Sequence, residues 1–333
     1  MIDAKVLVVG GGAIGGATAG MLAGNVSTVC VLDANAEHVA RMREPGLRLD
    51  IVGDEHTIPL DAYTDPAQLP GPFDFGICAL KSIAIEPALT PLAEANIADA
   101  WLSLGNGLVQ DRIAAIVGED RLLVGTVEFG GTNHGPGHLA KTSRSPYVIG
   151  EPDGTDSERL QRLKAILETA EPVIVSHNVQ AQIWSKLLVN STFSGLAVVG
   201  GLLYGEIAAH PVGRPLAIAL WREGHRVGKV QGLELEEVLT VHPDALTRDD
   251  EETERAVDQM IGQAVMVKAS MLQDVEKGIP CEVDVINGGV VKRGAEHGVP
   301  TPLNAEVVEI VHGFERGEGR PHTDHFARLA ALM

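Results

Sequence analysis

Short apolar runs alternate with amphipathic stretches along the first half of the chain. The pattern predicts strands at 5–9, 29–32, 73–78, 100–104 and 122–127, later strands at 147–150 and 173–175, and a hairpin at 46–59 that turns at Gly53-Asp54. It predicts helices at 13–23, 82–95, 108–117 and 157–169. Because strands and helices alternate, this half is predicted to form a parallel sheet covered by helices.

The second half has a different pattern, since strand signals nearly vanish after Asn178. Apolar residues at helical spacing predict helices at 179–199, 206–231, 252–276, 284–297 and 302–316, limited or kinked by Pro211, Pro215 and Pro243. A chain of 333 residues exceeds the usual size of one core. We therefore predict an α/β domain at 1–177, a doubly wound parallel sheet, then an all-helical domain at 178–333, with a small-molecule site in the cleft between them.

A glycine-rich turn follows the first predicted strand directly. Gly10, Gly12 and Gly15 have the spacing G-x-G-x-x-G between that strand and the first predicted helix. The first glycine allows the tight turn, the second lets the backbone approach a pyrophosphate, and the third lets helix pack on strand. Helix-terminal N–H groups, from Ala13 and Ile14, would then bind the phosphates. The first domain is therefore predicted as a Rossmann-type dinucleotide-binding domain.

An acidic residue, Asp33, ends the second predicted strand, 18 residues after Gly15. At this spacing a carboxylate accepts hydrogen bonds from the ribose hydroxyls of adenosine and repels a 2′-phosphate. No arginine or lysine follows before Arg41. We therefore predict that the chain binds NAD(H) in preference to NADP(H). The alternative is that Asp33 only caps the next helix.

Polar side chains follow two further strands of the predicted sheet. Lys81 comes after the strand at 73–78, and Asn106 lies in the loop after the strand at 100–104. The ligand crevice of an open parallel sheet lies at the carboxyl ends of its strands, so both residues are candidates for ligand binding. The alternatives are an exposed loop lysine and an ordinary Asn-Gly turn.

In the second half, Lys186 and Asn190 lie one helical turn apart on one face of a predicted helix. Trp184 and residues 187–189 are apolar enough to bury much of that helix. Both polar groups then need partners, because an unpaired buried polar group costs about 1–3 kcal/mol. A half-buried lysine can exchange its proton near neutral pH. The alternative is a lysine that extends to the surface beside a structural asparagine.

Two polar residues stand out in the last third of the chain. Ser270 opens the segment Ser270–Asp274 on a predicted helix that stops near Gly278. Glu282 follows Pro280 and falls near the N-terminus of the next helix, where backbone N–H groups favour a carboxylate. A helix cap or first-turn charge is the default interpretation of Glu282.

Together these residues resemble the ketopantoate reductase (2-dehydropantoate 2-reductase) family over nearly the whole chain. The resemblance is carried by the glycine-rich turn, Lys81, Asn106-Gly107, 184–190, 270–274, 282–284, Asn287-Gly288, and Thr301-Pro302 with Asn304. The block from Ser270 to Glu282 is the most specific, because a generic dinucleotide-binding protein does not need it.

The resemblance implies hydride transfer from a nicotinamide cofactor, NADPH in the family, to a 2-oxo acid between the two domains. It implies that Lys186 is the general acid that protonates the ketone oxygen, and that Glu282 binds near this lysine and a substrate hydroxyl. The chemistry agrees, since hydride arrival makes an alkoxide that a nearby ammonium stabilises and protonates.

The same resemblance implies binding roles for further residues. Asn190 would hydrogen-bond the substrate, Ser270 would meet its carboxylate, and Lys81 and Asn106 would line the nicotinamide end, where Asn106 would also meet the substrate. Ser194 stands one turn past Asn190 on the substrate-facing helix, so it is a further candidate for substrate binding.

The chain departs from the family pattern at four positions. Asp33-Ala34 replaces the usual arginine after the second strand, which favours NAD(H). Ser194 and Tyr204 replace two asparagines that help the family to select ketopantoate. The identity of the substrate's side chain is therefore left open. Glu128 stands where small hydroxyl residues are common, and a carboxylate there would favour a cationic substrate if it faces the cleft rather than the surface.

The chain is 45% apolar and 21% charged, as soluble globular proteins are, and carries a net charge of -19. This charge argues against nucleic acid or an anionic membrane as partner. No apolar run reaches the ~18 residues that cross a bilayer, and the N-terminus lacks a signal-type cleavage site. Three cysteines without metal or CxxC spacing, Cys30, Cys78 and Cys281, indicate a reduced chain, expected in the cytoplasm.

Histidines gather in a polar, glycine-rich stretch near the C-terminus, which holds His312, His322, Asp324 and His325. A metal site needs ligands that converge from fixed positions, and no metal is predicted there. His134 and His138 lie among glycines and are predicted to be solvated loop residues.

We therefore predict an enzyme that reduces a 2-oxo acid to a 2-hydroxy acid with NADH. The resemblance makes ketopantoate, and so pantothenate biosynthesis, the leading choice. The alternatives are a relative that acts on another 2-oxo or hydroxy acid or an opine-like substrate, and a catalytically silent NAD-binding regulator. The joint presence of Lys186, Asn190, Ser270 and Glu282 argues against the regulator. Monomer and homodimer both stay open.

Overall fold

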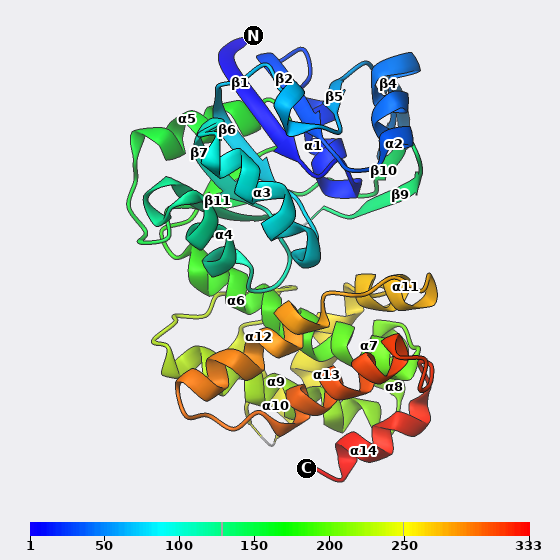
Figure 1. Ribbon diagram of the computed structural model, residues 1–333. Coiled ribbons are helices and arrows are strands. Elements are labelled where there is room, and N and C mark those ends of the chain that lie inside the picture. Colours follow the sequence, from blue (N-terminus) through cyan, green and yellow to red (C-terminus); the bar gives the residue numbers. More distant parts are fainter. Residues whose placement is uncertain (128, 249) are drawn as a thin grey trace. The chain divides into compact units, whose positions relative to one another are not determined.

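The protein is described by a computed structural model that covers residues 1–127, 129–248 and 250–333. It divides into two compact units, unit 1 (Met1–Val179) and unit 2 (Gln180–Met333) (Figure 1). Glu128, singled out in the sequence, lies outside the described residues.

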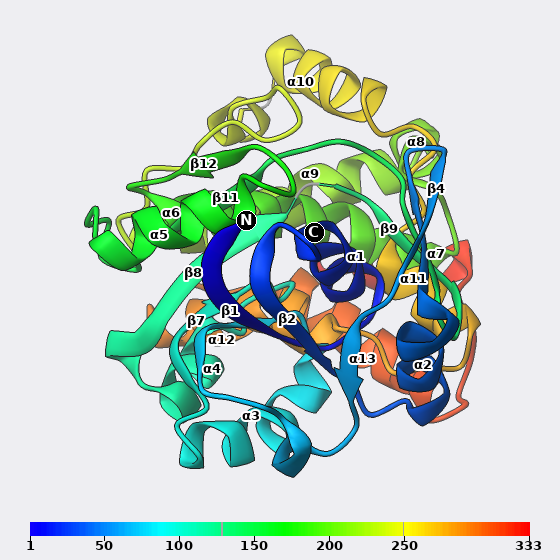
Figure 2. The same ribbon diagram turned by 90° about the horizontal axis from the view of Figure 1, so that it is seen from above.

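Unit 1 is built on an eight-stranded sheet. Its order is β12 (Val173–Val175), β11 (Tyr147–Gly150), β8 (Leu122–Val127), β7 (Ala98–Ser103), β6 (Phe73–Cys78), β1 (Ile2–Val9), β2 (Val26–Leu32) and β5 (Asp61–Tyr63). All neighbouring pairs are parallel except β11 with β8, and Figure 2 shows β1 and β2 side by side. The predicted α/β fold is confirmed.

The helices of unit 1 are α1 (Ala13–Leu22), α2 (Ala36–Arg41), α3 (Ile85–Glu94), α4 (Gln110–Val117) and α5 (Glu158–Leu167). Helices α2 and α5 begin at a side-chain cap: Asn35 accepts the N–H of His38, and Ser157 Oγ accepts the N–H of Leu160. Leu160, Leu163 and Ile166 of α5 share one buried core with α1 and the sheet. Burying each such side chain contributes about 1.5–3 kcal/mol.

A second, four-stranded sheet completes unit 1, in the order β4 (Asp54–Ile58), β3 (Leu47–Ile51), β10 (His138–Lys141) and β9 (Gly131–Gly135). The predicted hairpin at 46–59 is confirmed, but it turns at Val52-Gly53, where φ is 55° and 95°. The loop predicted around His134 and His138 was wrong, because these residues form strands β9 and β10. Glycine and histidine give no strand pattern, and β10 is held by pairing with the distant β3.

Unit 2 is helical over its described residues (Figure 1). Its helices are α6 (Val179–Val189), α7 (Gly195–Gly200), α8 (Tyr204–Ala209), α9 (Gly213–Val230), α10 (Glu251–Gly262), α11 (Ser270–Glu276), α12 (Val283–Glu296), α13 (Pro302–Glu315) and α14 (Phe326–Ala330). The helix predicted at 206–231 is interrupted at Pro211, and the one predicted at 252–276 is two helices. After the histidine-containing stretch, the chain ends in α14, which buries Phe326 and Leu329.

The helix predicted at 179–199 is interrupted by a π-helical turn at Asn190–Ser194, called the π turn below. A π turn holds an extra residue, disturbs the regular hydrogen-bond ladder and is frequent at functional sites. No helix of the described residues is long and apolar enough to cross a membrane.

Candidate functional site

In the glycine-rich turn after β1, the fold itself requires glycine at two of the three motif positions and leaves open space at the third. Gly10 has a φ of +95°, and a Cβ there would lie 2.7 Å from the carbonyl oxygen of Ala79. A Cβ at Gly15 would lie 1.9 Å from the carbonyl oxygen of Gly10. A Cβ at Gly12 would meet no described heavy atom within 4 Å. The space over Gly12 is therefore open, as a phosphate group requires.

Helix α1 begins directly after Gly12 and presents its N-terminus to this open space. Among the described residues, no side chain caps the helix and no acidic residue lies in its first turn. The first N–H groups, including those of Ala13 and Ile14, can therefore bind an anion, which the partial positive charge of the helix terminus favours. The turn fits the pyrophosphate of a dinucleotide.

Asp33 lies at the end of β2 and is partly exposed. Its Oδ2 accepts the N–H of Gly11 at 2.8 Å, and its Oδ1 accepts the N–H of Asn35 at 2.8 Å. The cap of α2 is Asn35, whose side chain accepts the N–H of His38, so Asp33 does not cap that helix. Each carboxylate oxygen keeps capacity to accept a further hydrogen bond, as ribose hydroxyls require.

Four predicted residues follow neighbouring parallel strands. Gly10 follows β1, Asp33 follows β2, Lys81 follows β6 by a short link, and Asn106 follows β7. The order β7-β6-β1-β2 brings them to one edge of the sheet, as the sequence predicted. Lys81 is exposed and Asn106 is half-buried.

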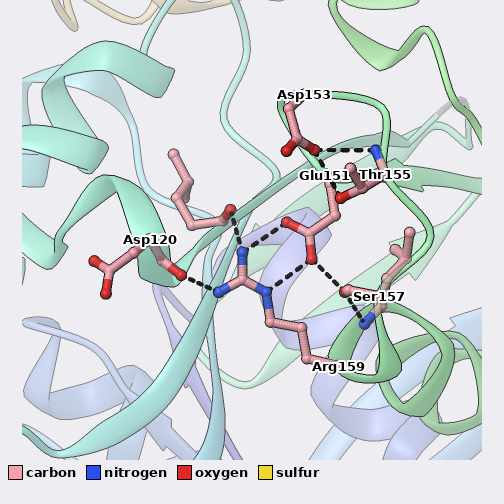
Figure 3. A network of polar contacts seen from close by, with 8 residues as sticks. Asp120, Glu151, Asp153, Thr155, Ser157 and Arg159 are labelled. Atoms are coloured by element: carbon pink, nitrogen blue, oxygen red, sulfur yellow. Dashed lines mark hydrogen bonds and ion pairs between the residues drawn. The ribbon is translucent and has the colours of Figure 1, made fainter.

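A second polar network of unit 1 lies elsewhere. Arg159 on α5 holds both carboxylate oxygens of Glu151, at 2.8 and 2.6 Å, and also donates to the backbone carbonyl of Asp120, while Ser157 donates to Glu151 (Figure 3). These residues surround the amino end of β8, opposite the edge that carries Asp33. The charges of Arg159 and Glu151 are paired with each other, so we assign this network to the stability of the fold.

In unit 2, helix α6 is anchored by close packing on α9. Trp184 donates from Nε1 to the carbonyl of Gly224 at 3.1 Å, and a Cβ at Gly228 would lie 2.5 Å from that nitrogen. Leu188 is fully buried, and a Cβ at Gly224 would lie 2.7 Å from its Cδ2. This contact fixes the face of α6 that carries Lys186, which is half-buried.

The π turn follows α6 and is braced by a chain of buried polar side chains. The carbonyl of Ser191 accepts from Asn287 Nδ2 at 2.8 Å, and this Nδ2 also donates to Asn304 Oδ1 at 2.9 Å. Asn304 Nδ2 donates to Glu223 Oε2 at 2.9 Å, and the carboxylate also accepts the N–H groups of Leu303 and Asn304. Glu223 thereby caps α13 and connects it to the turn that begins with Asn190.

Ser194 and Tyr204, which replace family asparagines, bond to each other. Their hydroxyl oxygens lie 2.6 Å apart, and both residues are buried. The Tyr204 ring packs on Phe193 with centroids 5.4 Å apart, and burial raises the pKa of Tyr204 to about 12. The two side chains therefore form a neutral pair whose hydroxyl groups are hydrogen-bonded to each other. Ser194 as a substrate ligand stays a prediction.

Ser270 opens α11 and is exposed, while Glu282 is half-buried just before α12. Glu282 stands at the N-cap position, but its side chain makes no capping hydrogen bond among the described residues. Both α11 and α12 pack against the π turn. The elements that carry Lys186, Asn190, Ser270 and Glu282 therefore meet around one turn of unit 2.

Within the described residues, no group of three or more side chains could hold a metal ion. The C-terminal histidines bond to other groups: His312 to Asp284 at 2.9 Å, and His325 to the carbonyl of Arg320 at 3.1 Å.

The chain matches family models over most of its length. Residues 6–154 match the model described as ketopantoate reductase PanE/ApbA, and residues 178–315 match the model of the C-terminal region of the same family. The chain is 27% identical over 315 residues to a 2-dehydropantoate 2-reductase of Halobacterium salinarum, covering 94% of this chain and 99% of that protein. It is 28% identical over 321 residues to the protein of that name from Aquifex aeolicus, with 93% and 97% covered.

Solved structures agree. A PanE/ApbA family ketopantoate reductase from Ralstonia eutropha superposes with a TM-score of 0.82 at 25% identity, over 94% of this chain and 99% of the other. D-mandelate dehydrogenase with NADH and anilino(oxo)acetate superposes with a TM-score of 0.80 at 22% identity, over 94% and 99%. At that identity the second likeness shows the fold alone.

Proposed function

The chain belongs to the ketopantoate reductase family, and on this premise we propose that it reduces a 2-oxo acid to a 2-hydroxy acid with NADH. The observation that carries the proposal is Lys186, half-buried on a helix that Trp184 anchors and one helical turn before Asn190. An ammonium group in that setting can protonate the oxygen of a ketone as negative charge develops on it.

We assign the dinucleotide to the glycine-rich turn of unit 1. Gly10, Gly12 and Gly15 shape the turn, and the N–H groups of Ala13 and Ile14 hold the pyrophosphate. Asp33 accepts the ribose hydroxyls, and its negative charge disfavours the 2′-phosphate that distinguishes NADP(H) from NAD(H). This supports NAD(H) as the preferred cofactor. By resemblance, Lys81 and Asn106 line the nicotinamide end.

The bound nicotinamide supplies the hydride, and the side chains of unit 2 handle the substrate. Lys186 donates its proton to the ketone oxygen, while Asn190 hydrogen-bonds the substrate and holds that oxygen near the ammonium. Ser270 binds the substrate carboxylate, and Glu282 orients Lys186 or a substrate hydroxyl. Since cofactor and substrate residues belong to different units, the proposal requires both units to contribute to one active site.

Ketopantoate is the leading substrate, because the family models and the named relatives point to it. A second candidate is a 2-oxo acid with a less polar tail. Its support is the Ser194–Tyr204 pair, whose hydroxyls bond to each other at 2.6 Å where family members offer amide groups. Compared with two amide side chains, this pair offers fewer hydrogen bonds to a hydroxylated substrate tail and more apolar contact from the tyrosine ring.

A panel of 2-oxo acids, assayed with NADH and with NADPH by following the reduced nicotinamide spectrophotometrically, tests both candidates. The panel holds ketopantoate, its analogue without the hydroxyl, an aromatic 2-oxo acid, and a 2-oxo acid with an amine for the opine-like alternative. We expect kcat/KM to be higher with NADH and to favour tails without a hydroxyl.

Efficient turnover of ketopantoate with every other 2-oxo acid inert would refute the second candidate and support ketopantoate as the substrate. Cofactor binding without turnover of any member of the panel would count against reduction of a 2-oxo acid and for a binding role.

A further inference from the structure

His38 is a buried histidine of unit 1 that neither the motif nor the family resemblance singles out. It lies on α2 and is 3% exposed. Its Nε2 lies 2.7 Å from the carbonyl oxygen of Gly11, and its Nδ1 lies 2.8 Å from the backbone nitrogen of Gly137. Both ring nitrogens are therefore used, and one of them contacts the glycine-rich turn itself.

The two backbone partners determine the tautomer of the ring. The N–H of Gly137 can only donate, so Nδ1 must be the unprotonated acceptor. The carbonyl of Gly11 can only accept, so Nε2 must carry the proton and donate it. The His38 ring is therefore neutral, and each nitrogen has a distinct role.

Both backbone polar groups of Gly11 are held, the N–H of the Gly10–Gly11 peptide and the carbonyl of the Gly11–Gly12 peptide. Asp33 Oδ2 accepts its N–H at 2.8 Å, and His38 Nε2 donates to its carbonyl at 2.7 Å. Gly11 precedes Gly12, over which the space for a phosphate is open. A carbonyl oxygen that turned toward this space would repel an anion, so the orientation of the Gly11–Gly12 peptide matters for binding.

The second partner of His38 belongs to the β9–β10 hairpin, which packs against the start of α1. A Cβ at Gly131 would lie 3.1 Å from that of Ala13, and a Cβ at Gly16 would lie 2.4 Å from Leu139 Cδ1. His38 thus connects α2, the hairpin turn at Gly137 and the glycine-rich turn.

We propose that His38 is a positioning residue for the dinucleotide: by donating to the carbonyl of Gly11, it keeps the phosphate-binding turn in its binding conformation. The inference rests on the proposed function, since it needs this turn to bind the cofactor. The pyrophosphate is common to NADH and NADPH, so His38 sets the affinity for both alike. Asp33 also supports the turn through the N–H of Gly11, and in the proposed function its carboxylate sets the choice between the two cofactors.

Two substitutions separate the two contacts. In His38→Gln the side-chain amide nitrogen takes the place of Nε2 and can still donate to Gly11. In His38→Asn the shorter side chain places its oxygen near the Nδ1 position, so the contact with Gly137 is kept and that with Gly11 is lost. His56→Phe, at an exposed histidine of β4 in the same unit, is the matched control.

The dissociation constants of NADH and NADPH are measured by fluorescence titration without any 2-oxo acid. We expect His38→Asn to raise both constants by about tenfold or more, with their ratio unchanged, because a lost buried hydrogen bond has an effect of that size. His38→Gln and His56→Phe should stay within about threefold of the wild type. Circular dichroism and thermal unfolding verify that each variant is folded.

Equal affinities of His38→Asn and the wild type would overturn the inference, as would a change in the ratio of the two constants or an equal loss in His38→Gln. If His38→Asn does not fold, His38→Phe, which keeps a ring but neither hydrogen bond, replaces it with the same expectation. A wild-type chain that binds neither NADH nor NADPH would instead refute the proposed function, so the two failures are distinguishable.

Discussion

The glycine-rich turn of unit 1 and the π turn of unit 2 are both irregular pieces of backbone held by buried polar side chains, but the supporting residues differ in origin. Gly11 is held by Asp33 and His38, which follow it by 22 and 27 residues on the next strand and helix. The carbonyl of Ser191 in the π turn is held by Asn287, 96 residues away.

The two turns also differ in how much of the fold depends on them. Around Gly11, the side chain of Asp33 is partly exposed, and the region remains open toward the phosphate position. Around the π turn, Glu223, Asn287 and Asn304 are almost fully buried and connect three helices. We infer that the first region is left open for a ligand, whereas the geometry of the second region also supports the stability of unit 2.

Lys186→Ala should give the largest effect and separate binding from chemistry. If Lys186 is the general acid, kcat should fall by roughly 10²–10⁴-fold, while the dissociation constant of NADH changes little, because the proposed cofactor contacts lie in unit 1. The exposed Lys292 on α12 provides the control, Lys292→Ala, which should keep normal kcat. A folded Lys186→Ala chain with full reductase activity would rule out this assignment of the acid.

Glu223→Leu tests the support of the π turn. It removes the acceptor for the backbone N–H groups of Leu303 and Asn304 and for the Asn304 side chain, and each unpaired buried donor costs about 1–3 kcal/mol. We expect the free energy of unfolding in urea to fall by about 3 kcal/mol or more. Glu309→Leu, at an exposed glutamate of α13, should change it by about 0.5 kcal/mol at most. A loss for Glu223→Leu as small as the control's would show that the network does not brace unit 2.

The same contrast explains how much of the molecule the sequence could predict. Strands β6, β8, β11 and β12 have the predicted bounds, because each is a short apolar run with local breaks on both sides. The edge that gathers Gly10, Asp33, Lys81 and Asn106 followed from the order of strands and helices. Strands β9 and β10 were missed because their residues have no strand pattern and are fixed by β3 and α1, far away in sequence.

The residues that support the candidate site could not be predicted from the sequence for a similar reason. His38 looks like an ordinary helix residue until the structure brings Gly137 to its other nitrogen, 99 residues away. Glu223 lies in a predicted helix and gives no sign that it caps α13. Asn287 and Asn304 were flagged only by the family resemblance, and the structure supplies their physical role in bracing Ser191.

Asp33→Ala tests the glycine-rich region with a smaller expected effect. Loss of the carboxylate removes the acceptor for the ribose hydroxyls and the repulsion of a 2′-phosphate. We expect the wild type to prefer NADH, and Asp33→Ala to shift the ratio of the two dissociation constants toward NADPH by about tenfold, or about 1.4 kcal/mol. Asp54→Ala, on exposed strand β4, should leave the ratio unchanged. A wild-type chain that binds NADPH tenfold more tightly than NADH would contradict the assignment of Asp33 as the residue that selects NADH.

Substitution of Asp244 should change the free energy of unfolding least, because this carboxylate is half-exposed whereas that of Glu223 is buried. Asp244 Oδ1 lies 2.7 Å from His225 Nε2, two residues beyond Glu223 on α9, and this hydrogen bond lowers the pKa of Asp244 below its ordinary value. A carboxyl whose pKa is lower in the folded chain stabilises the folded chain at every pH above the unfolded-state pKa, about 3.9. That contribution is lost as the pH falls through the folded-state pKa.

Since Asp244 is half-exposed, Asp244→Asn should lower the free energy of unfolding by less than about 1 kcal/mol at pH 7. The difference between the two chains, measured by urea unfolding from pH 7 to about pH 3, should close as the carboxyl becomes protonated. A difference that widens toward low pH would mean that Asp244 stabilises unit 2 in its protonated form.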